Sequence, residues 1–147
     1  MIDKEILLTE LKAKVLEKIE TLEHLINDTR ASNNDTKSSM GDKYETSREV
    51  LQQQINNLQN QLKVVQQQLV LLNNLNISPK TLASLGSIVT TNIATYFISI
   101  SLGELKTGGN KVFAISEQSP IGQFLLNKKI GDEFSFNSKK QSILAIY

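Results

Sequence analysis

The side chains that could take part in chemistry are few, and the most promising are carboxylates in one polar segment. The chain of 147 residues contains no Cys and a single His, His24. It therefore cannot build a cysteine nucleophile or a thiolate zinc site, and one His lacks the partners that a zinc or acid–base site needs. The polar segment 28–45 carries Asp35, Asp42 and Glu45, and carboxylate oxygens are ligands that a hard cation such as Mg²⁺ prefers.

These polar residues also have structural interpretations. Asp42 and Glu45 stand three residues apart, which is the spacing of a capping box at the start of a helix. Asp35 suits a turn. The segment also holds two lysines and a tyrosine, which suit either a solvated surface and helix packing or contact with a partner: Lys37, Lys43 and Tyr44.

The elements that must position these residues differ between the two halves of the chain. Residues 1–77 contain no Pro and one Gly, whereas both prolines and six of the seven glycines follow. Apolar residues in 1–27 recur at spacings of three and four, which predicts an amphipathic helix. A second stripe alternates spacings of four and three without a break, the 3.5-residue period of a coiled coil. Its members are Leu51, Ile55, Leu58, Leu62, Val65, Leu69 and Leu72.

The simplest way to bury the two apolar stripes is to pack them against each other. We expect an antiparallel helical hairpin, a coiled coil over residues 1–76, with a polar tip at 28–45. The alternative is a parallel dimer through the second helix, which leaves the first stripe without an obvious partner.

Residues 80–147 have the composition of a β domain. Segments rich in β-branched and aromatic residues predict a small antiparallel sheet of about five strands, at 88–91, 95–102, 111–115, 133–136 and 143–147. Gly108 and Gly109 predict a hairpin turn. Ser119 and Pro120 predict the N-cap and first turn of one short helix. The predicted class is therefore α+β, a helical hairpin followed by a small antiparallel β domain with one short helix.

Charge and hydropathy exclude several classes of protein. The 16 basic and 15 acidic side chains leave a net charge of +1, without the surplus of positive charge that drives nucleic-acid binding. No apolar run is long enough to cross a bilayer, and residues 1–14 lack the apolar core of a signal peptide. We expect a cytoplasmic protein with no membrane contact.

One stretch of the β half resembles a known family. Residues 115–133 read Ile-Ser-Glu-Gln-Ser-Pro-Ile-Gly-Gln-Phe-Leu-Leu-Asn-Lys-Lys-Ile-Gly-Asp-Glu. The Ser-x-x-Ser-Pro-Ile-Gly run, the Leu-Leu after it and the Gly-Asp-Glu at the right distance resemble the signature of the Gre family of bacterial transcript-cleavage factors. The Gly-Asp-Lys-Tyr-Glu run at 41–45 is similar to the family's Asn-Ala-Glu-Tyr at the start of the second helix. Phe124 departs from the pattern, because the family usually carries a small residue there.

This resemblance implies a partner and a mechanism. Gre factors bind RNA polymerase, with an FKBP-like C-terminal domain on the rim of the secondary channel and the hairpin reaching inward. An Asp and a Glu at the hairpin tip help hold a second Mg²⁺ at the polymerase active site, where activated water cuts backtracked RNA. In this chain the implied tip residues are Asp35, Lys37, Asp42, Lys43, Tyr44 and Glu45. Among them, the resemblance makes Asp42 and Asp35 the candidate ligands of the Mg²⁺ shared with the polymerase. The implied docking residues are Ser119, Pro120, Ile121, Gly122 and Phe124.

The acidic pair of the family is replaced here. Its two acids precede the helix-opening Tyr by seven and four residues, and the positions counted back from Tyr44 hold Lys37 and Met40. A lysine carries the wrong charge for Mg²⁺ and a thioether is too soft a ligand. We therefore expect no vigorous stimulation of transcript cleavage.

The leading hypothesis is a monomeric polymerase-binding factor that modulates pausing, backtracking or cleavage and is not itself an enzyme. It would hold no cofactor stably, share Mg²⁺ with the polymerase active site, and contact RNA only indirectly. Either Asp42 with Asp35 or Glu45 forms an altered acidic tip, or the tip occupies the channel without useful ligands. The alternative is a coiled-coil dimeric adaptor with no polymerase role.

Overall fold

The computed structural model describes residues 2–38 and 45–147, without the side chains of residues 34–38, 45 and 46. The chain forms two compact units, one made of residues 13–70 and the other of residues 1–12 together with 71–147. Each unit is described by itself below. The domain boundary that the change in composition predicts at residues 76–80 stays a prediction.

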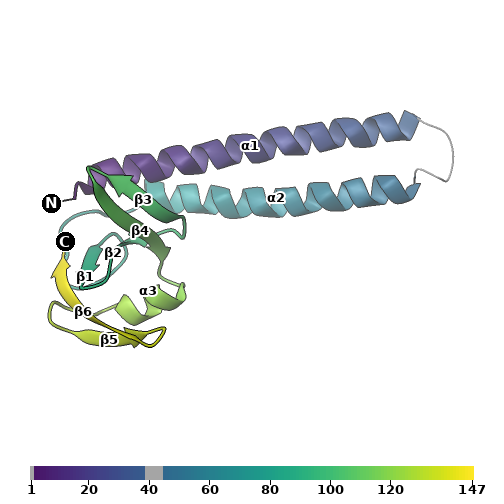
Figure 1. Cartoon of the computed structure of the whole chain (residues 1–147). Helices are drawn as coiled ribbons and strands as arrows, with labels where there is room; N and C mark the ends of the chain where they lie inside the picture. Colours follow the sequence, from purple (N-terminus) through teal and green to yellow (C-terminus); the bar gives the residue numbers. More distant parts are fainter. Residues whose placement is uncertain (1, 39–44) are drawn as a thin grey trace. The chain divides into compact units, whose positions relative to one another are not determined.

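Two long helices dominate the N-terminal half. Helix α1 spans Lys4–Ser38 and helix α2 spans Glu45–Asn73, and they run antiparallel as a hairpin (Figure 1). Asp3 caps α1, because its Oδ1 accepts hydrogen bonds from the backbone N–H groups of Glu5 and Ile6 at 2.9 and 3.4 Å. Helix α1 thus continues to Ser38, whereas the sequence predicted a polar tip from residue 28. The added stretch is polar but contains no Gly or Pro, so no residue in it breaks the helix.

The predicted apolar stripes form the seam of the hairpin. In the unit 13–70, Val15, Ile26 and Ile55 are buried, and the other members of the stripes are half-buried. Leu16 and Val64, which lie outside the seam, are about half exposed. The seam residues are covered by the chain itself, as expected of an intramolecular hairpin.

The C-terminal half is a six-stranded sheet with one short helix, α3 (Pro120–Leu125). The strands are β1 (Ile88–Thr91), β2 (Thr95–Ser99), β3 (Gly103–Thr107), β4 (Asn110–Ser116), β5 (Glu133–Phe136) and β6 (Lys139–Ile146). Their order in the sheet is β3-β4-β2-β1-β6-β5, and Figure 1 labels them. The predicted α+β class is confirmed.

The sheet differs from the prediction in two respects. It has six strands rather than about five, because β3 was missed: its sequence GELKT holds a single apolar residue, Leu105. The sheet is also not wholly antiparallel, since β2 and β4 pair in parallel with Tyr96 opposite Phe113. The chain leaves β2, forms β3, and turns at Gly108 and Gly109 into β4, which then lies between β3 and β2 in the same direction as β2.

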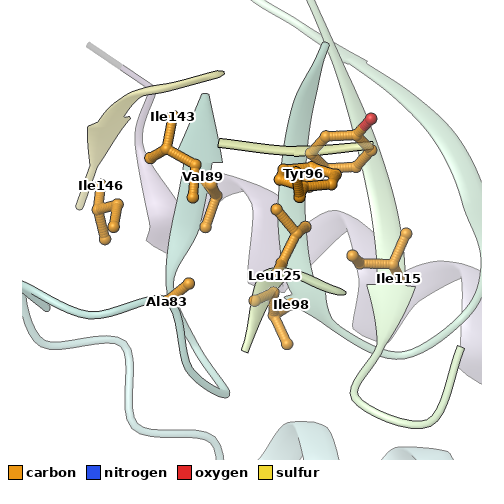
Figure 2. Packing of buried hydrophobic residues seen from close by; sticks show 9 residues of the cluster. Ala83, Val89, Tyr96, Ile98, Ile115, Leu125, Ile143 and Ile146 are labelled. Atoms are coloured by element: carbon orange, nitrogen blue, oxygen red, sulfur yellow. The ribbon is translucent and has the colours of Figure 1, made fainter. Parts of the chain in front are cut away.

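The sheet is covered on both faces at strand β2. Successive residues Tyr96, Phe97, Ile98 and Ser99 of β2 are all buried, and a strand buried on every residue has no solvated face. One face belongs to a cluster that α3 closes with Leu125 (Figure 2). The members of the cluster are Ala83, Val89, Tyr96, Ile98, Ile115, Leu125, Phe134, Ile143 and Ile146.

The helix ends that belong to the β unit contribute buried apolar residues of their own. Leu7, Leu11 and Leu72 are fully buried. Near them Lys4 donates a hydrogen bond from Nζ to the carbonyl of Ser78 at 3.3 Å. Partial burial, together with the charge of Lys80, lowers the pKa of Lys4 from 10.5 to about 8. In the described part of the chain, no helix combines the length and apolar character that a bilayer crossing requires.

Candidate functional site

The Ser-Pro-Ile-Gly motif forms a tightly bonded loop between β4 and α3. The Ser119 hydroxyl donates to the carbonyl of Ser116 at 2.7 Å and accepts from the backbone N–H of Gly122 at 3.1 Å. The backbone N–H of Ser119 in turn donates to the Ser116 hydroxyl at 3.1 Å. Ser119 is therefore the N-cap of α3, as the sequence predicted, with Pro120 in the first turn.

Gly122 is required by the close approach of two backbone segments. A Cβ atom at this position would lie 2.1 Å from the carbonyl oxygen of Ser116 and 2.9 Å from the Ser119 hydroxyl. Contact at that distance forces the loop to move. The Gly of the motif thus shapes the loop, whatever else the loop contacts.

Phe124 belongs to an aromatic group on the surface of the β unit. Its ring stacks on Phe134 with centroids 6.2 Å apart and meets the edge of Phe136 at 5.7 Å. Phe134 is buried, yet Phe124 remains 45% exposed. The unusual residue of the motif therefore adds an exposed aromatic ring that is held in place by two others.

The five predicted docking residues divide by burial. Pro120 and Phe124 are exposed, Ser119 and Ile121 are half-buried, and Gly122 is buried. Ile121 packs against the core cluster of the sheet. The structure thus brings all five together on one loop and helix, but only Pro120 and Phe124 offer a largely free surface to a partner.

The face of the β5–β6 hairpin opposite to Phe134 and Phe136 carries an ion pair. Lys140 Nζ lies 2.9 Å from Glu133 Oε2 on the β5–β6 hairpin. This hydrogen bond and the lysine charge lower the pKa of Glu133. Glu133 is the last residue of the Gly-Asp-Glu run, and its carboxylate is therefore occupied by a neighbour in the same hairpin.

The predicted tip residues fall at the edge of the described chain or beyond it. Asp42, Lys43 and Tyr44 lie outside the described residues, as does Met40. Asp35 and Lys37 lie within α1, and Glu45 begins α2, but their side chains are outside the described part. The proposed roles of all these residues therefore remain predictions from the sequence.

The seam of α1 includes a polar residue that was not predicted from the sequence. Asn33 is 9% exposed, and its Oδ1 atom has no hydrogen-bond partner among the described residues. The sequence does indicate this position, because Ile26, Thr29 and Asn33 continue the alternating spacings of three and four residues that mark the seam. An unpaired buried amide in a seam is costly, so the far part of the hairpin is less stable than an apolar seam would make it.

The described residues contain no obvious metal centre. Among them, no group of three or more His, Cys, Asp or Glu side chains converges as metal ligands would. His24 lies 3.8 Å from Asp28 one helical turn away, and both side chains are mostly exposed.

Comparisons with known proteins give a similarity to a solved structure. No family model matches the chain, and no curated protein matches it. The solved structure of the transcription factor Gfh1 matches over 92% of this chain and 92% of its own, with 15% sequence identity and a TM-score of 0.38. A similarity of this size carries no inference about function.

Proposed function

We propose that this protein is a transcription factor of the Gre kind that binds bacterial RNA polymerase, with the helical hairpin in the secondary channel and the β unit docked on the rim. The FKBP-like character of the β unit and the polymerase partner both come from the sequence resemblance. The protein acts on pausing, backtracking or transcript cleavage without a catalytic centre of its own.

The observation that carries the proposal is the surface formed by Pro120 and Phe124. These residues belong to the Gre-like motif, they are exposed, and the Ser119 cap and the contact at Gly122 hold their backbone in one conformation. An exposed aromatic ring that is already immobilised loses little entropy when a partner covers it. This is the property expected of a docking anchor.

The hairpin supports the second half of the proposal. Helix α2 has 29 residues, so it is about 44 Å long at 1.5 Å per residue. Its apolar seam is covered by α1, which leaves a continuous rod with a surface rich in Gln and Asn. Such a rod can enter a channel as a rigid element.

At the tip, two mechanisms remain open, and both rest on sequence alone. In one, Asp42 with Asp35 or Glu45 supplies carboxylates to a Mg²⁺ shared with the polymerase. In the other, the tip fills the channel without useful ligands and competes with factors that stimulate cleavage. Lys37 and Met40 at the positions of the family's acids favour the second mechanism.

The first test measures docking. We expect Phe124→Ala to weaken binding of the labelled protein to RNA polymerase about tenfold, the effect of losing an interface anchor. Leu144→Ala is the matched control, because Leu144 is a 57% exposed apolar residue of strand β6, outside the motif. Equal affinities for Phe124→Ala, Leu144→Ala and the unchanged protein would refute docking through this surface.

The second test measures the effect of the tip on a backtracked elongation complex. Slower intrinsic cleavage in the presence of the protein is expected if the tip only occupies the channel, and faster cleavage that Asp42→Asn abolishes is expected if it supplies a ligand. The double variant Lys37→Asp, Met40→Glu should gain cleavage stimulation, because it restores hard oxygen ligands. No effect of any of these proteins at saturation would refute the polymerase proposal.

A failed polymerase test would leave the coiled-coil adaptor as the alternative. It is the weaker hypothesis because Val15, Ile26 and Ile55 are already covered within one chain. A dimer through the same seam would first have to open the hairpin. Light scattering separates the two, since a mass of 16.4 kDa corresponds to one chain.

A further inference from the structure

A groove on the β unit lies outside the Gre-like motif. It has a volume of about 530 Å³ and lies between the β1–β2 turn and the start of β4. Ile93, Ala94 and Phe113 form its apolar part, while Asn92 and Lys111 are among its polar residues. Ile93 is 47% exposed, so this apolar surface is open to a ligand.

Hydrogen bonds between side chains and backbone N–H groups hold one wall of the groove in place. The Thr91 hydroxyl accepts hydrogen bonds from the N–H groups of Ile93 and Ala94 at 3.2 and 3.1 Å. Asn92 Oδ1 accepts from the N–H of Ser142 at 2.8 Å, and the NH₂ group of Asn92 forms no hydrogen bond with the described residues. The wall is therefore formed before a ligand arrives, and it offers a free amide donor.

The charges beside the groove are arranged unfavourably for the free protein. Lys106 and Lys111 stand directly opposite each other in the β3–β4 pair, so both side chains project from the same face. Like charges in that position repel each other. Glu104 pairs with Lys111, with its Oε2 3.4 Å from Nζ, and one positive charge is left over. A bound anion would relieve this repulsion.

The small surplus of positive charge beside the groove favours a peptide over a nucleic acid. Lys111 Nζ lies 5.5 Å from the centre of the Phe113 ring, so a positive charge and an aromatic surface lie side by side. With Glu104 paired to Lys111, one surplus positive charge remains, whereas nucleic-acid binding uses several lysines or arginines to neutralise successive phosphates. An acidic peptide needs only one or two carboxylates near the lysines and one apolar side chain on Ile93 and Phe113.

We propose that this groove binds an acidic, apolar-containing peptide segment of a partner protein. Carboxylates of the segment pair with Lys106 and Lys111, its apolar side chain lies against Ile93, Ala94 and Phe113, and Asn92 donates to its backbone. The site is separate from the loop at Ser119–Phe124 and does not depend on polymerase binding.

The experiment is a titration of the isotopically labelled full chain, followed by amide chemical shifts in NMR. The probe is the blocked peptide Asp-Glu-Leu-Asp-Glu, and the blocked peptide Lys-Lys-Leu-Lys-Lys is its control. We expect saturable shifts at Ile93, Ala94, Lys111 and Phe113 with the acidic peptide alone. Lys106→Gln and Lys111→Gln should each weaken binding about threefold, as expected for exposed ion pairs. The matched control Lys63→Gln removes an exposed lysine of the other compact unit and should leave the affinity unchanged.

Several outcomes would overturn this proposal. Shifts that appear at lysines throughout the chain, or an equal loss of affinity in Lys63→Gln, would mean unspecific attraction of charge. A stronger response at the same residues to a ten-nucleotide oligothymidylate would make the groove a nucleic-acid site. Absence of shifts at millimolar peptide would mean that the groove binds no acidic segment. The spectra also report whether each variant is folded, so a misfolded variant cannot be mistaken for lost binding.

Discussion

Replacing Asn33 with Leu should stabilise the hairpin. Asn33 occupies a seam position in α1, is 9% exposed, and carries an amide oxygen that has no partner in the described part of the chain. The change removes that unsatisfied atom and places an apolar side chain of similar size where the spacing of the seam requires one. Most substitutions at buried positions destabilise a protein, so a gain in stability here is a demanding prediction.

The magnitude follows from two contributions. A buried polar atom without a partner costs about 1–3 kcal/mol, and Leu has a higher helix propensity than Asn by roughly 0.5 kcal/mol. We expect the free energy of unfolding to rise by about 2 kcal/mol in total. Asn60→Leu is the matched control, because Asn60 lies on the exposed face of α2. That variant should gain only the propensity contribution.

The assay is urea unfolding followed by helical circular dichroism. With a slope of about 2 kcal/mol per molar urea, the midpoint for Asn33→Leu should rise by about 1 M with no change of slope. A gain no larger than that of Asn60→Leu would refute the reasoning and would mean that the amide is well hydrated or paired in solution. Light scattering belongs with this assay, because a polar seam residue can also specify the oligomeric state. A mass above the 16.4 kDa of one chain, seen only in Asn33→Leu, would assign the amide that role.

Three further predictions concern the β unit. Gly122→Ala should destabilise the protein by about 1–3 kcal/mol, measured by urea unfolding, because the added Cβ would lie 2.1 Å from the Ser116 carbonyl oxygen; an unchanged midpoint would mean that the loop yields freely. Ser119→Ala should cost about 1 kcal/mol through loss of the N-cap, whereas Ser119→Thr should retain most of the stability; equal losses in both would point to packing rather than to the hydroxyl. The pKa of Lys4 is lowered to about 8 in the folded chain, so between about pH 8 and 10.5 the unfolded chain binds the extra proton and stability rises with pH. The urea midpoint of the unchanged protein should therefore approach that of Lys4→Met across this window, and parallel curves would contradict the lowered pKa.

Features that depend on neighbours along the chain could be predicted from the sequence. The seam from Leu51 to Leu72 follows from a period of 3.5 residues, and the cap at Ser119 follows from its position before Pro120. The turn at Gly108 and Gly109 follows from two residues that tolerate positive φ. Each of these preferences acts within one or two turns of backbone, so the local sequence carries it.

Features that depend on distant partners could not be predicted in this way. The parallel pairing of β2 with β4 depends on where the chain returns after β3, and GELKT by itself has little strand character. The length of α1 depends on a seam whose last described members are Thr29 and Asn33, so the hydropathy pattern ends before the helix does.

The same division separates the two candidate surfaces. The sequence alone identified the motif residues Ser119–Phe124 through their resemblance to a family, and the absence of Cys excluded a cysteine nucleophile and a thiolate zinc site. Only the tertiary structure determined that Phe124 rests on Phe134 and Phe136 and stays exposed. Only strand pairing set Lys106 opposite Lys111 beside the groove. The physical reason is that local preference determines backbone conformation, whereas the surroundings of a side chain are determined by segments that are distant in sequence.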